Sequence, residues 1–164
     1  MTKIILIILI AILAPINTSA NTQTLKIDSI NLNTQVVNAS QSLSQASRLM
    51  DNNPVNQASQ LCSDDHSYIA GHSSPTKRNQ KAGRVFANLH KLEIGDLIQA
   101  NDCQYEVKEI RVLTGRANRN GFTYTFDLDD WEYAVSDTFE NGTLTLQTCT
   151  KKLGQILIIK AQKI

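Results

Sequence analysis

Cys149 is the residue with the clearest chemical potential in this chain. It ends the stretch Gly-Thr-Leu-Thr-Leu-Gln-Thr-Cys-Thr at 142–150, whose alternation of apolar and polar residues predicts a β-strand. Leu144 and Leu146 would share one face, and Cys149 would share the other with polar residues, away from a core. Structural free cysteines are usually small buried hydrophobes. We therefore interpret Cys149 as a candidate nucleophile, with packing or a disulfide as the alternative.

His72 is the candidate base for that thiol. It follows the short strand predicted at 68–70 and precedes the loop signal Ser-Ser-Pro at 73–75. Functional side chains are often presented where a rigid element meets a loop. The other two histidines, His66 and His90, are interpreted as surface or packing residues.

The two remaining cysteines, Cys62 and Cys103, bear on whether Cys149 is free. In an oxidising compartment an even pair closes and leaves one thiol. If Cys62 pairs with Cys103, Cys149 is the free one; the alternatives are three reduced thiols or a bridge that includes Cys149. No metal-ligand spacing such as CxxC or HExxH occurs, so neither a metal nor another cofactor is predicted.

The N-terminus has the pattern of a targeting segment. Lys3 precedes an uninterrupted apolar run at 4–14, Pro15 breaks it, and small residues follow at 18–20. This arrangement is typical of a secretory signal peptide and is shorter than a membrane-spanning helix needs. We expect residues 1–20 to be a signal peptide or a membrane anchor, residues 21–164 to form one domain, and the chain to act outside the cytoplasm.

The net charge and the hydrophobic periodicity of the sequence limit its possible partners and its fold class. With 16 basic and 15 acidic residues, the chain gives no indication of a nucleic-acid partner. Many short alternating runs separated by turn signals predict a mostly β barrel or sandwich with minor helix. We expect strands at 25–37 with a bulge or turn at 28–29, 68–70, 93–98, 105–113, 122–126, 142–150 and 156–161. A helical turn is predicted at 85–92, and either a short helix or a polar loop before Pro54; the stretch 127–136 is mixed and acidic and is assigned no element.

Five segments, in order, resemble those of sortases, the cysteine transpeptidases of bacterial surfaces. They are Leu-Lys-Ile-Asp-Ser-Ile-Asn-Leu at 25–32, Tyr-Ile-Ala-Gly-His at 68–72, the F-x-x-L…L-x-x-G-D-x-I pattern at 86–98, the T-L-x-T-C signature at 145–149, and the final strand at 157–161. This resemblance implies a closed eight-stranded β-barrel with one or two short helices. It also implies that Cys149 and His72 face one another across a groove.

The resemblance further implies the reaction. The Cys149 thiol would attack a backbone carbonyl of a sorting peptide on a protein substrate and form a thioacyl intermediate. An amine acceptor, such as a cell-wall peptide or a pilin lysine, or else water, would then resolve it. The membrane would be contacted only through the N-terminal segment. L,D-transpeptidases also use Cys and His, but their S-x-G-C motif does not match 145–149.

One position departs from the sortase pattern. Sortases carry an arginine at the start of the last strand, where this chain has Gln155 or Ile156, depending on the alignment. We expect Gln155, a neutral donor, and Thr148 to touch the substrate or the oxyanion. Lys151, Lys152 or an arginine of the 116–119 loop could supply the missing charge. The alternative is a catalytically impaired barrel that binds peptides or proteins outside the cytoplasm.

Overall fold

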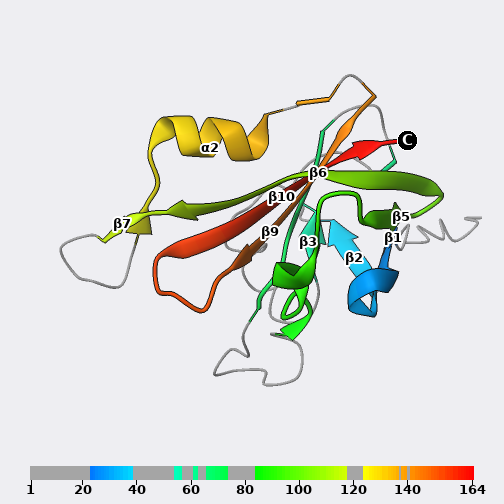
Figure 1. The fold of residues 1–164 in the computed structure, drawn as a ribbon, viewed down its shortest axis with the longest axis horizontal. Helices are drawn as coiled ribbons and strands as arrows, with labels where there is room; N and C mark the ends of the chain where they lie inside the picture. Colours follow the sequence, from blue (N-terminus) through cyan, green and yellow to red (C-terminus); the bar gives the residue numbers. More distant parts are fainter. Residues whose placement is uncertain are drawn as a thin grey trace, which may run out of the picture.

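A computed structural model describes residues 23–38, 54–56, 61–62, 66–73, 84–117, 124–136, 138–139 and 141–164 of the protein. Eight strands close into a barrel in the order β1-β2-β3-β4-β9-β10-β6-β5 (Figure 1). The barrel strands are β1 (Gln23–Ile27), β2 (Leu32–Asn38), β3 (Val55–Asn56), β4 (Ser67–Ala70), β5 (Leu97–Ala100), β6 (Cys103–Thr114), β9 (Thr143–Cys149) and β10 (Gln155–Lys163). The predicted mostly β barrel is confirmed.

Short elements complete the described part of the chain. They are the 3-10 turns η1 (Asp28–Ile30) and η3 (Leu89–Lys91), the two-stranded sheet of β7 (Arg116–Ala117) and β8 (Tyr124–Thr125), and the helix α2 (Leu128–Val135). The helical turn predicted at 85–92 is confirmed by η3, and the strand predicted at 122–126 appears as the two residues of β8. The helix or loop expected before Pro54 falls at 43–50, which lies outside the described residues.

The strand β9 lies between β4 and β10 in the barrel and pairs with both. It runs parallel to β4, with Ile69 opposite Leu146, and antiparallel to β10, with Ile159 opposite the same Leu146. These three side chains are fully buried in the main core cluster, which fills the barrel interior. Alternation along β9 therefore directs Leu144 and Leu146 inward, as predicted.

The opposite face of β9 is also buried, which the sequence did not predict. Thr143 and Thr145 have no exposed area, because a second apolar layer covers this outer face of the barrel. That layer includes Ala134 of α2 together with Ile158 of β10 and Tyr68 of β4. The prediction that the polar face of this strand lies away from a core is wrong for its first half, and holds only at the Cys149 end, which is exposed.

The helix α2 explains why the outer face of β9 is buried in its first half. It lies on the side of β10 away from β1 and β2 (Figure 1). The mixed, acidic stretch 127–136 was assigned no element from the sequence, and the structure forms α2 (Leu128–Val135) there. Asp129 and Asp130 occupy the first helical turn, where acidic side chains favour the helix dipole. A helix of eight residues is too short to stand alone in water and depends on packing of its inner face.

A disulfide joins Cys62 to Cys103, which confirms the first of the three alternatives for the cysteines. It connects the segment after β3 to the first residue of β6 across 41 positions of sequence. Cys149 is the free thiol. Within the described ranges no helix is long and apolar enough to cross a membrane; the predicted targeting segment at 1–20 lies outside them.

Candidate active site

Cys149 is the last residue of β9 and is exposed. A tight turn at 150–154 then returns the chain into β10, with the Thr150 amide donating to the Gln155 carbonyl at 3.0 Å. The hydroxyl of Thr150 accepts from the Lys152 amide at 3.1 Å, and Gly154 adopts a positive φ of 76°. Cys149 thus lies at a strand end that is held in place by the turn that follows it.

His72 lies beside Cys149 because β4 continues its alignment with β9 past its last paired residue. On one side of His72, the Gly71 carbonyl accepts from the Thr148 hydroxyl at 2.8 Å. On the other side, the Ser73 hydroxyl donates to the carbonyl of Cys149 itself at 2.6 Å. The two bonds bracket His72 against the last two residues of β9, so the structure brings the two predicted catalytic residues together on neighbouring strands.

Thr148 and Ser73 hold these two strand ends together. Thr148 is buried and its hydroxyl is used in the bond to Gly71, so it positions the backbone rather than facing solvent. Ser73 was not singled out from the sequence. The only signal for it is its place directly after His72, in a loop that has to stay close to the nucleophile strand.

The position opposite Cys149 on β10 is Ile156, not Gln155. Cross-strand partners project to the same face of a sheet and consecutive residues to opposite faces, so Ile156 shares the face of Cys149. Its side chain is 7% exposed. The Gln155 amide instead donates to the Thr114 hydroxyl at 3.1 Å and accepts from the Thr150 hydroxyl at 3.3 Å. An apolar side chain therefore stands where a cation could reach the thiol from β10.

Two lysines of the turn are the cations of the described residues that line the pockets next to Cys149. Lys151 and Lys152 are both exposed and follow Cys149 by two and three positions. Arg116, the other cation considered from the sequence, pairs with Asp127 at 3.4 Å on the surface. Arg119 lies outside the described residues.

The surroundings of Cys149 act on its protonation. Although the residue as a whole is exposed, the protein around the thiol removes water from it, and this desolvation raises the pKa of Cys149. A raised pKa means a smaller thiolate fraction at neutral pH than an ordinary cysteine has. A thiol in these surroundings needs a neighbouring base if it is to react as a thiolate at neutral pH, and His72 lies on the adjacent strand end.

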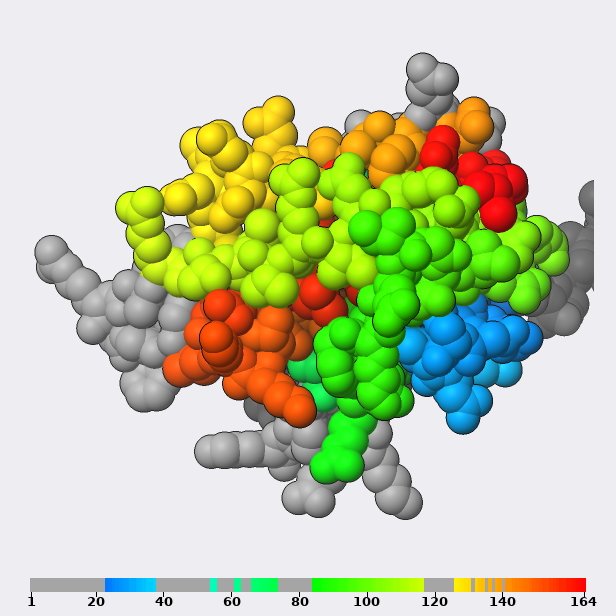
Figure 2. Space-filling model, viewed as in Figure 1, coloured from blue at the N-terminus to red at the C-terminus, as the bar shows by residue number. Residues whose placement is uncertain are grey.

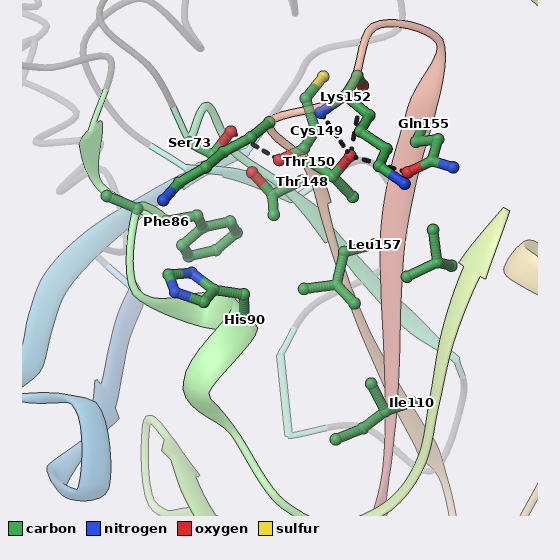
Figure 3. Close-up of a pocket in the computed structure, with 13 residues that line it drawn as sticks. Ser73, Phe86, His90, Ile110, Thr148, Cys149, Thr150, Lys152, Gln155 and Leu157 are labelled. Carbon is green, nitrogen blue, oxygen red and sulfur yellow. Dashed lines mark hydrogen bonds between the residues drawn. The ribbon is translucent and has the colours of Figure 1, made fainter. Parts of the chain in front are cut away.

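Two pockets meet at Cys149. The larger, here called the mouth pocket, has a volume of about 510 Å³ and an apolar lining that includes Phe86, Ile110 and Leu157 (Figure 3). His90 lines it as well, so this residue belongs to the wall of the site and not only to the surface. In Figure 3 the sulfur of Cys149 lies at the rim and points away from the rings of Phe86 and His90.

The second pocket, here called the outer pocket, has a volume of about 360 Å³. Phe126, Leu153 and Ile156 line it, and it shares Cys149 and the 150–152 turn with the mouth pocket. In the space-filling view the β9–β10 turn (orange-red) and the segment around η3 (green) stand on either side of a hollow (Figure 2). No group of three His, Cys, Asp or Glu side chains that could hold a metal ion occurs among the residues the structure describes.

The order of the barrel strands and the cysteine at the end of β9 fit one known protein family. A family model for the sortase domain matches residues 25–164, and the chain belongs to the sortase family. The predicted resemblance is confirmed. Sortases are a family of cysteine transpeptidases.

Solved structures agree with this assignment. Sortase C1 of Streptococcus agalactiae superposes with a TM-score of 0.63 at 17% identity, covering 87% of this chain and 66% of that one. A sortase D5 transpeptidase of Clostridium perfringens gives 0.57 at 25% identity, over 87% and 78% of the two chains. Sortase C-1 of Actinomyces oris gives 0.63 at 18% identity, over 87% and 72%. The search of curated proteins finds no match.

Proposed function

We propose that this protein is a cysteine transpeptidase, or hydrolase, that cleaves a sorting peptide of a protein substrate through a thioacyl intermediate on Cys149. The observation that carries the proposal is the bracketing of His72 by the bonds from Thr148 to Gly71 and from Ser73 to Cys149. These bonds keep a base next to an exposed thiol at a place where two pockets meet.

In the first half of the reaction, His72 takes the thiol proton as the sulfur of Cys149 attacks a peptide carbonyl carbon. The carbon–sulfur bond forms, the carbon–nitrogen bond breaks, and His72 returns the proton to the departing amine. Since Ile156 gives no charge to the oxyanion, the reaction lacks a donor of the kind whose loss costs about 10²–10³ in rate. We expect a slow enzyme unless a lysine of the turn compensates.

The proposed place of action is outside the cytoplasmic membrane. The Cys62–Cys103 disulfide supports it, because such bonds persist in oxidising compartments and are rare in the cytosol. The targeting pattern of residues 1–20 points the same way. As a member of the sortase family, the protein would then meet sorting signals of exported proteins, with a peptide amine or water as the second reactant.

A second candidate function is a barrel that binds a peptide or a partner protein without turning it over. The apolar Ile156 opposite Cys149 and the raised pKa of the thiol favour it. Thiol reactivity separates the two functions. In a catalytic site the alkylation rate of Cys149 depends on pH through two groups and changes when His72 is replaced, whereas an isolated thiol reacts only as its own raised pKa is approached from below.

The decisive experiment is intact-mass analysis of the disulfide-bonded protein with a library of candidate sorting peptides. Wild type is compared with Cys149→Ala, His72→Ala and the polar substitute His72→Gln. We expect a thioacyl adduct on wild type, none on Cys149→Ala, and strongly slowed formation in both His72 variants. No adduct with any peptide, together with an alkylation profile that His72→Gln leaves unchanged, would favour the binding barrel.

A further inference from the structure

Hydrogen bonds from two segments of the chain hold His72 and the residue before it. From β9, the Gln147 carbonyl accepts from the Gly71 amide at 3.0 Å, and the Thr148 hydroxyl donates to the Gly71 carbonyl at 2.8 Å. From the segment that leads into η3, the Phe86 amide donates to the His72 carbonyl at 3.0 Å. The proposed base is therefore fixed both to the nucleophile strand and to a second part of the fold.

The ring of Phe86 lies directly against Gly71. A Cβ placed on Gly71 would lie 2.7 Å from Cδ2 and 2.9 Å from Cε2 of that ring, a separation that real Cβ atoms essentially never show. Gly71 has no positive φ, so this close approach, and not the backbone conformation, is what requires glycine here. The ring has no exposed area and packs in the main core cluster, so it cannot turn aside into solvent.

A glycine directly before the base would by itself leave the base loosely held, because glycine has more backbone freedom than any other residue. The last residue of β4 that pairs with β9 is Ala70, opposite Gln147. Beyond Ala70, the path of the chain depends on the bonds of Gly71 and on what packs against it. The Phe86 ring fills the space that a side chain at 71 would take, and so restricts the backbone at this point.

We propose that Phe86 is a positioning residue for His72; this inference rests on the proposed function. The ring of Phe86 sets the path of the chain at Gly71, and its amide fixes the His72 carbonyl, so that the imidazole stays within reach of the Cys149 thiol. Phe86 has no side-chain group that exchanges a proton, so its effect on proton transfer passes through His72. The effect is expected to be large, because misplacing a catalytic group by about 1 Å can cost about 10² in rate.

The test measures alkylation of Cys149 by iodoacetamide across pH, in the whole disulfide-bonded protein in which Cys149 is the free thiol. For wild type we expect a profile set by two groups, and for His72→Gln a profile set by the thiol alone. In Gly71→Ala the added methyl meets the ring, so the rate at neutral pH should fall about tenfold and the profile should approach that of His72→Gln. Phe86→Leu keeps the amide but loses the ring, and a fall of about threefold is expected.

The decisive variant combines the two changes. Leucine is smaller than phenylalanine and leaves room for the methyl group at 71, so Gly71→Ala/Phe86→Leu should recover the rate of Phe86→Leu alone and a two-group profile. The matched control is Ile98→Val on β5, which is fully buried in the same core cluster but lines neither pocket. It should lower stability in a denaturant titration and leave the pH profile unchanged.

The outcomes separate this inference from the proposed function. If Gly71→Ala keeps the wild-type profile, or if the double variant stays as slow as Gly71→Ala, the ring does not position His72 and the inference is wrong. Should Gly71→Ala not fold, Phe86→Leu decides, since a rate and profile equal to those of Ile98→Val would overturn the inference. If wild type itself shows the profile of the thiol alone, and His72→Gln leaves it unchanged, the proposed function fails and the positioning role fails with it.

Discussion

The two ends of the β9–β10 strand pair differ in how tightly neighbouring side chains hold them. At the end near α2 the outer face is dense with bonds: the buried Lys160 ammonium donates to the Ser136 carbonyl and hydroxyl at 3.1 and 3.0 Å and to the Thr138 hydroxyl at 2.5 Å. It also lies 4.4 Å from the centre of the Tyr133 ring. At the other end, Cys149 and Ile156 face a pocket. One end fixes the sheet, and the other leaves a thiol accessible.

This difference shows how a small barrel can hold a reactive residue still without burying it. The anchoring is placed four residues along β10 from the position opposite the nucleophile, at Lys160 rather than Ile156. Tyr133, whose ring lies against the Lys160 ammonium, connects this anchored region to β6, because its hydroxyl donates to Glu109 at 2.9 Å. Near Cys149, within the described part of the chain, the neighbouring strand is joined by the Ser73 and Thr148 hydroxyls and by the backbone bond from Gly71 to Gln147.

The largest expected effect comes from removing the anchor. In Lys160→Met, the acceptors at Ser136 and Thr138 lose their donor, and we expect the free energy of unfolding to fall by about 2–3 kcal/mol. If the two ends are independent, the alkylation rate of Cys149 in the folded protein stays the same. Denaturant titration and alkylation kinetics measure the two quantities.

The control for that variant is Lys26→Met, which removes an exposed lysine paired with Asp28 at 3.0 Å. Exposed pairs contribute about 0–1 kcal/mol, so this substitution should change stability little. Equal losses in the two lysine variants would show that the buried ammonium is no anchor, and slower alkylation in Lys160→Met would show that the ends are coupled.

An intermediate effect is expected at the reactive end. Ile156→Arg places a guanidinium on the face of Cys149, where the outer pocket gives it room to reach water. We expect thioacyl formation to rise about tenfold, a part of what one preorganised donor is worth. Leu128→Arg adds the same charge at an 85% exposed site on α2 and serves as the control. An equal rise in both variants would reveal a general charge effect, and no rise in Ile156→Arg would mean that the site does not lack a donor there.

The smallest effect is expected for the bond that joins the two catalytic segments. Ser73→Ala removes the donor to the Cys149 carbonyl, and we expect thioacyl formation to slow about fivefold, in line with about 1 kcal/mol for one hydrogen bond. Ser73→Thr keeps the hydroxyl and should recover most of the rate. A single-turnover comparison decides the matter; if the threonine variant is as slow as the alanine variant, the hydroxyl has no part in positioning the site.

Periodicity predicted a mostly β fold, and the ordered resemblance to sortases predicted the closed barrel. Alternation along β9 and a histidine at the end of a short strand marked Cys149 and His72 as candidates, and the resemblance alone predicted that they lie close together. The covered outer face was missed because whether a row of threonines meets water or another layer depends on α2, whose eight residues give a weak pattern of their own. The sequence could not decide whether Gln155 or Ile156 lies opposite Cys149. That depends on the register between β9 and β10, which cannot be read from the sequence when the length of the connecting turn is not known.

The Cys62–Cys103 bridge makes a covalent ring of the chain between its two ends, and His72 is inside this ring while Cys149 is outside it. Closing a loop with a separation of 41 residues stabilises the fold by about 4 kcal/mol in the chain-entropy account. The reductants commonly added to protect a catalytic thiol would open this ring. They would keep the nucleophile intact while loosening the segment that carries its base, so a preparation handled that way could lose activity with every cysteine reduced.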